Sequence, residues 1–265
     1  MIRRTVIRAA LMAACLTPLT LQPLAAQEAS PAVTQPQAEN PARVLLVGNS
    51  YLYYNDSLHN HLRRMVMAGT EVEPQYKSAT IGGARLDHHN IDWLTQPGAI
   101  GVEEPFELVI LQGHSNAALS EKNQTRYMEA AKAATALIAE RGGKVALYMP
   151  HAYVDPHKSA DPENIRANER FYTQAGNELD AIVIPVALAF EEAYKRRPEM
   201  ALHKDYDGSH PSLLGSFLAA ATAYATLYGA DPVGNEYDYF GKVGAEDAAF
   251  LQEVARDTVN AYFGR

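Results

Sequence analysis

Cysteine, basic residues and long apolar runs are all scarce in this chain, and each shortage removes a class of protein. Cys15 is the only cysteine among 265 residues and lies near the N-terminus, so the rest of the chain has no disulfide and no thiol chemistry. Lysine and arginine total 23 against 31 aspartates and glutamates, which gives a net charge of −8 at pH 7. Such a surface repels nucleic acid and anionic membranes, so a neutral partner is expected.

The first 26 residues have the organisation of a cleaved signal peptide. Three arginines precede an apolar stretch that is too short to span a membrane, and Ala25-Ala26 closes it as a cleavage site. We therefore expect export to a periplasmic or secreted location, without stable membrane insertion. A lipid anchor at Cys15 is the less favoured alternative, because the residues that follow stay apolar instead of forming a polar tether.

The remainder divides into a linker and one domain. Residues 27–41 contain three prolines among Gln, Ala and Ser, which is the composition of a disordered linker. Residues 42–265 are enough for one domain with a sizeable core. Without the first 26 residues the chain has 20 basic and 31 acidic residues, a net charge near −11.

Short apolar stretches alternate with longer helical patterns along residues 42–265, which is typical of βαβ units. We expect strands at residues 44–47, 72–80, 106–111, 145–149 and 181–186. Helices are expected after residues 55–56 and at residues 120–141, 162–179, 187–197, 211–228 and 245–263. The pattern predicts an α/β fold, a three-layer α/β/α sandwich with a five-stranded parallel sheet in the flavodoxin-like order 2-1-3-4-5. Its ligand crevice would lie at the carboxyl ends of the first and third strands.

Two short clusters far apart in the domain carry groups suited to nucleophilic catalysis. Gly-Asn-Ser at 48–50 follows the first expected strand, and Asp-Gly-Ser-His-Pro at 207–211 precedes a helical run. A serine hydroxyl becomes a nucleophile when a neutral imidazole takes its proton and a carboxylate holds the tautomer of that imidazole. Ser50, His210 and Asp207 supply these groups at element boundaries. The same Asp-x-x-His spacing at Asp56 and His59 falls in a helix, so position rather than spacing favours the second cluster.

The order Ser, Asp, His also occurs in α/β-hydrolases, but their Gly-x-Ser-x-Gly elbow is absent here. From residue 44 to residue 227 the chain instead resembles the SGNH hydrolases, the GDSL-type esterases and lipases. Residues 48–50 look like the first motif of that family, with Asn49 in place of its usual aspartate, and Asp207-x-x-His210 matches its last motif. The resemblance implies Ser50 as nucleophile, His210 as general base and then acid, and Asp207 as orienting carboxylate, with no cofactor.

The resemblance also implies an oxyanion hole with three donors. These would be the Ser50 amide, a glycine amide after the second strand and an asparagine side chain after the third. Gly83 is the expected glycine. The family's Gly-x-Asn becomes Gly-His-Ser-Asn at 113–116, so Asn116 is the expected donor and Ser115 or Gln112 remains an alternative. The competing interpretation is that these residues only cap the next helix.

Aromatic and histidine side chains near the motifs are expected to line the substrate crevice. Tyr51 adjoins Ser50, and His114 and His151 follow the third and fourth strands, so these three are expected to contact the substrate. Tyr53 and Tyr54 extend the aromatic run beside the nucleophile. No metal site is expected, because no histidine and carboxylate set has a recognised zinc-protease spacing.

These features predict a serine esterase that hydrolyses short-chain, acetyl-like esters of a carbohydrate or other small carrier. The lack of long apolar segments and the acidic surface argue against a lipase that works at a membrane interface. The main alternative is a non-catalytic periplasmic carbohydrate-binding protein on the same scaffold, and a metal-dependent hydrolase ranks third.

Overall fold

The apolar stretches of the sequence form one parallel sheet in a computed structural model that describes residues 30–265. Five strands pair in the order β2-β1-β3-β4-β5, so the predicted topology is confirmed. The strands are β1 (Arg43–Gly48), β2 (Gln75–Thr80), β3 (Leu108–Gln112), β4 (Lys144–Tyr148) and β5 (Ile182–Ile184). β2 begins three residues later than expected, after Pro74, which has no N–H to donate to a ladder.

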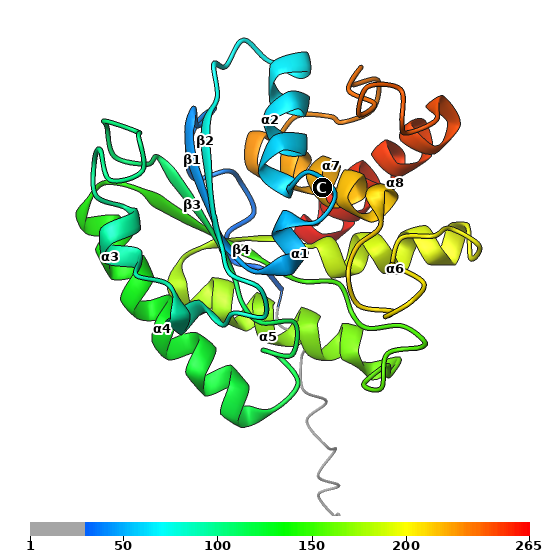
Figure 1. The fold of residues 1–265 in the computed structure, drawn as a ribbon, viewed down its shortest axis with the longest axis horizontal. Helices are drawn as coiled ribbons and strands as arrows, with labels where there is room; N and C mark the ends of the chain where they lie inside the picture. Colours follow the sequence, from blue (N-terminus) through cyan, green and yellow to red (C-terminus); the bar gives the residue numbers. More distant parts are fainter. Residues whose placement is uncertain (1–29) are drawn as a thin grey trace, which may run out of the picture.

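Helices cover both faces of the sheet, as Figure 1 shows. One layer contains α2 (Leu58–Gly69), α6 (Val186–Arg196), α7 (Leu213–Tyr228) and α8 (Ala245–Phe263), and the other contains α3 (Ile91–Leu94), α4 (Glu121–Glu140) and α5 (Glu163–Leu179). Successive β1 residues alternate between the two cores: Val44 and Leu46 pack towards α2 and α7, and Leu45 and Val47 towards α4. Both sheet faces are therefore buried, as parallel sheets require.

The carboxyl ends of the strands meet at one edge of the sheet. Gly48 at the end of β1 is in register with Thr80 of β2, and Gln112 of β3 with Tyr148 of β4. The short helix α1 (Ser50–Tyr53) and the one-turn η1 (Leu86–His88), which the sequence analysis did not predict, also lie in the connections that leave this edge. The expected crevice edge is thus where the chain places these turns.

The segment before α7 reaches the same edge through two close backbone approaches. A Cβ at Gly215, in the first turn of α7, would lie 2.2 Å from the Leu202 carbonyl oxygen. A Cβ at Gly208 would lie 2.0 Å from the Val154 carbonyl oxygen, and φ there is +59°. Only glycine fits either position without backbone movement, so the segment packs on α7 near Leu202 and on the loop that follows β4 near Gly208.

The N-terminal part of the described chain departs from expectation. Residues 30–41, expected to be a disordered linker, form neither helix nor strand but lie against the domain. The Ala32 amide donates to Asn177 Oδ1 (2.7 Å), the Gln37 side chain donates to the Asp180 carbonyl (2.8 Å), and Val33 packs on the core. Partners on α5 thus compensate for the missing secondary structure. The expected signal peptide, residues 1–26, lies outside the described residues. No helix within residues 30–265 is long and apolar enough to cross a membrane.

Candidate active site

The nucleophile candidate Ser50 is the first residue of α1, directly after β1 and the capping residue Asn49. The Asn49 side chain accepts a hydrogen bond from the Tyr51 amide (3.1 Å), which caps this four-residue helix. Ser50 is 9% exposed, so its hydroxyl lies at the bottom of the turn rather than on the outer surface. A Cβ at Gly48 would lie 2.3 Å from Gln112 Oε1, so the strand needs a glycine here.

Asn49 also holds three connections together. Its side-chain nitrogen Nδ2 donates to the carbonyls of Ala84 (3.0 Å) and Gly113 (3.2 Å), which lie in the loops after β2 and β3. The fully buried Gln112 side chain donates to Asn49 Oδ1 (2.9 Å) and accepts from the backbone N–H of Asn49 (2.9 Å). An aspartate at position 49 could accept these bonds but could not donate to the two carbonyls. Asparagine in place of the family's usual aspartate therefore suits this network.

The second cluster forms an irregular loop between α6 and α7. An isolated antiparallel bridge pairs His203 with Pro211, and the Lys204 amide donates to the His210 carbonyl (2.8 Å). Within the loop, Asp207 Oδ1 accepts from the amides of Ser209 (2.9 Å) and His210 (3.0 Å). These bonds fix the Asp207 carboxylate relative to the His210 ring, with Gly208 allowing the turn between them.

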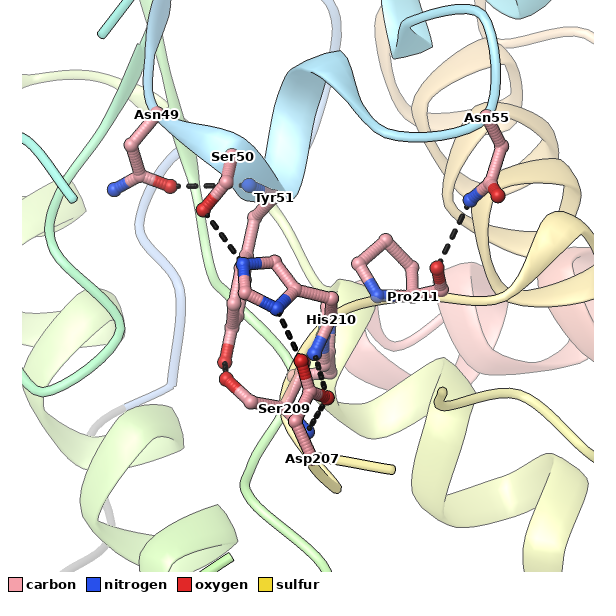
Figure 2. A network of polar contacts seen from close by, with 9 residues as sticks. Asn49, Ser50, Tyr51, Asn55, Asp207, Ser209, His210 and Pro211 are labelled. Atoms are coloured by element: carbon pink, nitrogen blue, oxygen red, sulfur yellow. Dashed lines mark hydrogen bonds and ion pairs between the residues drawn. The ribbon is translucent and has the colours of Figure 1, made fainter. Parts of the chain in front are cut away.

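Figure 2 shows how the loop presents His210 to Ser50. His210 Nε2 lies 2.9 Å from Ser50 Oγ, and His210 Nδ1 lies 2.6 Å from Asp207 Oδ2. Burial acts to raise the pKa of Asp207, but hydrogen bonds from the His210 ring and from the Ser209 and His210 amides outweigh it, so that the pKa lies below its usual value. A charged Asp207 keeps the proton of a neutral imidazole on Nδ1, which leaves Nε2 free to accept the Ser50 proton.

Two further contacts join the nucleophile segment to the acid–base loop. The Tyr51 hydroxyl lies 2.9 Å from Ser209 Oγ. The Asn55 side-chain amide donates to the carbonyls of Pro211 (2.9 Å) and Ser212 (2.8 Å), as the right of Figure 2 shows in part. Together with the Ser50–His210 bond, these contacts cross-link the two segments at three successive places.

Asn55 begins a run of three residues in the left-handed region. The φ angles of Asn55, Asp56 and Ser57 are 54°, 70° and 66°. Each such residue costs of order 1 kcal/mol, although Asn and Asp tolerate this conformation best. The buried His61 ring donates to the Asn55 carbonyl (2.6 Å), so both the backbone carbonyl and the side chain of Asn55 are held. The contacts of Asn55 thus retain a strained connection between the two segments.

Two of the three expected substrate contacts, Tyr51 and His151, are buried behind the site. His151 is 1% exposed and is sandwiched between Tyr51 (4.3 Å between ring centroids) and Phe190 (4.4 Å). Its Nε2 donates to the Ser209 carbonyl (2.8 Å), and burial followed by the neighbouring His203 lowers its pKa well below the usual value. Tyr51, 4% exposed, therefore serves as a packing surface for the acid–base loop rather than as a crevice wall.

The third expected contact, His114, is half-buried in the loop after β3. Its Nδ1 accepts from the Asn116 amide (3.3 Å), and burial lowers its pKa although a hydrogen bond with Asn116 raises it. His114 and Asn116 also line a small cavity of about 10 Å³ beside Arg85 and Tyr127. Within residues 30–265 no cluster of three His, Cys, Asp or Glu side chains could hold a metal ion.

The oxyanion candidates differ in how far they are engaged elsewhere. Both polar atoms of Gln112 are bonded to Asn49 and the side chain is fully buried, so Gln112 is engaged with Asn49 rather than turned to the crevice. Ser115 Oγ lies 2.6 Å from the Tyr153 hydroxyl. Gly83 lies in the turn after β2 with φ +65° and with open space at its Cβ position. No hydrogen bond among the described residues joins Gly83, Ser115 or Asn116 to Ser50, so the choice of Gly83 and Asn116 stays a prediction.

The contact of Tyr54 with His210 and the role of Asn55 were not predicted from the sequence. Tyr54 stacks on the His210 ring at 4.2 Å and 14°, so it covers one face of the imidazole. The one available signal for Asn55 was the run Asn-Asp-Ser at 55–57, three residue types that favour turns and that mark a bend after the nucleophile.

Known proteins were compared with this chain by sequence and by structure. No protein-family model matches it, and no curated protein has a matching sequence. A DUF4886 family protein from Bacteroides uniformis has a similar structure, with 16% identity and a TM-score of 0.59 over 81% of this chain and 93% of its own. A candidate SGNH hydrolase from Slackia heliotrinireducens is 22% identical, with a TM-score of 0.58 over 71% of this chain and 99% of its own.

A third similar structure is Axe2, an acetylxylan esterase from Geobacillus stearothermophilus. It is 15% identical, and it aligns with a TM-score of 0.55 over 76% of this chain and 98% of its own. At such identities the likeness concerns the path of the backbone, and the reaction has to be argued from the site. This chain therefore has the fold of the SGNH hydrolases.

Proposed function

We propose that the protein is a serine ester hydrolase that acts through an acyl-enzyme. The observation that carries the proposal is the continuous relay from Ser50 Oγ through the His210 ring to Asp207, with contacts of 2.9 and 2.6 Å. These distances lie within reach for proton transfer. The similar structures include SGNH hydrolases and acetylxylan esterases, which supports a hydrolase.

Each step of the proposed reaction uses groups of this relay. Ser50 Oγ attacks the ester carbonyl as its proton moves to His210 Nε2, and the carbonyl oxygen becomes an oxyanion. When the intermediate collapses, the C–O bond to the alcohol breaks and His210 returns the proton to the alcohol oxygen. Water then gives a proton to His210 as its oxygen attacks the acyl-enzyme. When this second intermediate collapses, the bond from the acyl carbon to Ser50 Oγ breaks and His210 returns the proton to Oγ, which releases the acid and regenerates Ser50. Asp207 stays charged and stabilises the imidazolium formed in both halves.

The proposed substrate is a short acyl ester, such as an acetyl group on a carbohydrate. An acidic chain is poorly suited to an anionic membrane surface, and Axe2, a similar structure, is an acetylxylan esterase. Export to a periplasmic or secreted location remains part of the proposal. Acetyl and butyryl esters of 4-nitrophenol should be hydrolysed well ahead of the palmitoyl ester, and a preference for palmitoyl esters with activation at a lipid interface would contradict it.

A fluorophosphonate probe tests the nucleophile directly, because it reacts with a serine that an adjacent base activates. We expect one adduct by intact-protein mass spectrometry, located on Ser50 by peptide mapping and absent from Ser50→Ala. Ser120→Ala, at the exposed cap of α4, is the matched control and should be labelled like the wild type. A chain that takes no label and hydrolyses no ester would instead support the alternative of a non-catalytic carbohydrate-binding protein.

A further inference from the structure

Exposed apolar side chains are concentrated beside the triad. Seven large apolar side chains are exposed among the described residues, and three of them, Tyr53 (41%), Ile81 (48%) and Tyr206 (65%), belong to the connections around Ser50 and His210. Single exposed apolar residues are ordinary, but a group of them next to a reacting centre marks a surface that a ligand covers. None of these three takes part in the relay.

Tyr54 lies between the exposed Tyr53 and Tyr206 and forms a row with them. Tyr53 and Tyr54 stack with 5.6 Å between centroids and 19° between planes, and Tyr54 stacks on His210 at 4.2 Å. Tyr206 lies near enough to Tyr54 to raise the pKa of the Tyr54 hydroxyl. At the other end, the Tyr53 hydroxyl lies against Gly82, where a Cβ would be 3.2 Å away. We call Tyr53, Tyr54 and Tyr206 the tyrosine platform; it runs from the loop after β2 to the acid–base loop.

The chemistry of the relay decides which half of an ester lies over this platform. In acylation His210 gives its proton to the departing alcohol oxygen, so that oxygen must lie within hydrogen-bond distance of His210 Nε2. The alcohol that continues from this oxygen therefore extends over the His210 side of the site. Tyr54 covers a face of that same ring, so the alcohol carrier rather than the acyl group meets the platform.

From this placement we propose that the tyrosine platform is a subsite for a neutral pyranose, the sugar that carries the ester. The proposal rests on the serine esterase function argued above. Tyrosine rings suit the C–H face of a pyranose, and their hydroxyls can bond to its ring substituents, since tyrosine presents an apolar body with a polar tip. Tyr206 lies between Asp205 and Asp207 in the sequence, after Lys204, so this stretch has a net negative charge in an acidic chain, which favours a neutral sugar over a uronate.

The platform predicts a loss that depends on the alcohol of the substrate. β-D-Xylose tetraacetate and ethyl acetate share their acyl group, but the ethyl group is too small to cover the rings. We expect Tyr53→Ala and Tyr206→Ala each to lower kcat/KM for the sugar acetate about tenfold, mainly through KM, and the double variant to lose more. Ethyl acetate should lose no more than about threefold. Trp93→Ala, an exposed aromatic of similar exposure on α3, is the control and should change neither substrate. Tyr54 is left intact because it touches His210.

Other outcomes would overturn the pyranose subsite. Equal losses on both acetates would mean that the tyrosines only support the triad. A loss on phenyl acetate that spares the sugar acetate would assign the platform to aryl carriers. If the wild type hydrolyses neither ester, the proposed reaction fails. The platform is then tested by saturation-transfer difference NMR, which measures the binding of xylobiose to Ser50→Ala. Saturation transfer that disappears in the variant also lacking Tyr53 and Tyr206 side chains supports it, and no transfer to Ser50→Ala overturns it.

Discussion

The two segments that form the triad are held in place in different ways. The nucleophile segment, residues 48–55, continues a central strand, and the Asn49 and Gln112 side chains tie it to two neighbouring loops. The acid–base loop, residues 203–212, belongs to no strand of the sheet and is held by its own turn bonds, one bridge and hydrogen bonds to the loop after β4. A sheet can fix a nucleophile, but the position of the base depends on a few contacts across the gap.

Those contacts distinguish positioning from chemistry. Tyr51 bonds to Ser209, and Asn55 to Pro211 and Ser212, so these contacts flank His210 on both sides along the acid–base loop. The reacting groups and the cross-links should therefore respond differently to substitution. Removal of a reacting group abolishes turnover, whereas removal of a cross-link lowers turnover by loosening the geometry of an intact triad.

The largest effect is expected where the two segments meet. Ser50→Ala and His210→Ala should each remove nearly all ester hydrolysis, about 10⁵-fold or more in kcat, because neither group acts alone. The double variant should be hardly worse than either single one. Steady-state kinetics with 4-nitrophenyl acetate measures all three, and circular dichroism checks their folding. Losses that multiply in the double variant would show that the two residues work independently, against a relay.

The same contrast explains how much of the molecule could be predicted from sequence. All five strands could be predicted, four of them as continuous apolar runs between helical patterns and the more polar β2 from its place in the alternation. Their order was expected from the flavodoxin-like arrangement, because apolar runs alone do not determine which strands pair. The triad could be predicted because Ser50, Asp207 and His210 lie at element boundaries. The acid–base loop has no periodic pattern, and its path depends on contacts such as that between Gly208 and Val154, over 50 residues apart.

Side-chain direction at the site could not be predicted in the same way. Tyr51 and Tyr53 both lie within three residues of Ser50, but α1 turns Tyr51 inward to His151 and leaves Tyr53 exposed. A four-residue helix is too short to show a period, so the inward residue cannot be identified from the pattern. Likewise, the pairing of Asn49 with Gln112 joins residues 63 apart, and nothing local marks it.

The second prediction concerns the loop after β3, which belongs to neither the nucleophile segment nor the acid–base loop. Asn116→Ala should lower kcat about 10²-fold with little change in KM, since an oxyanion donor acts mainly in the transition state. Ser115→Ala is the matched comparison, because Ser115 already bonds to Tyr153. Both variants are assayed with 4-nitrophenyl acetate. If Ser115→Ala reproduces the loss and Asn116→Ala does not, the donor has been assigned to the wrong residue.

The third prediction tests the cross-link at Asn55. Asn55→Ala should lower kcat by about tenfold to a hundredfold with KM nearly unchanged, because the triad groups remain but His210 is less well placed. Asn55→Gly separates the two roles of this residue, since glycine accepts φ near 54° but has no amide. Asn60→Ala, in the first turn of α2, is the control: the Asn60 side-chain amide donates to Asp56 in the preceding loop and does not reach residues 203–212.

A full recovery of kcat in Asn55→Gly would mean that backbone conformation, and not the cross-link, matters at this position. We expect Gly and Ala to have similar kcat values, with the glycine variant the more stable of the two in thermal unfolding. A loss of kcat in Asn60→Ala as large as in Asn55→Ala would assign the effect to the strained loop as a whole.

The smallest expected effect on turnover, but a clear one on stability, comes from His203 at the start of the acid–base loop. Burial lowers the pKa of His203 to about 4, although hydrogen bonding to Ala152 and the charge of Asp207 raise it. In the unfolded chain the ring takes up a proton near pH 6.5, whereas the folded state excludes it until about pH 4, so the free energy of unfolding falls as the pH drops through this window. Between pH 7.5 and pH 5 this one group should lower the free energy of unfolding by about 2 kcal/mol.

His203→Gln removes this dependence on pH, so urea unfolding should show a smaller loss of stability towards acid pH in the variant than in the wild type. His88→Gln, in a histidine that lies on the exposed turn η1, should leave the wild-type slope. Parallel pH curves for His203→Gln and the wild type would mean that the loop is not held by a neutral His203.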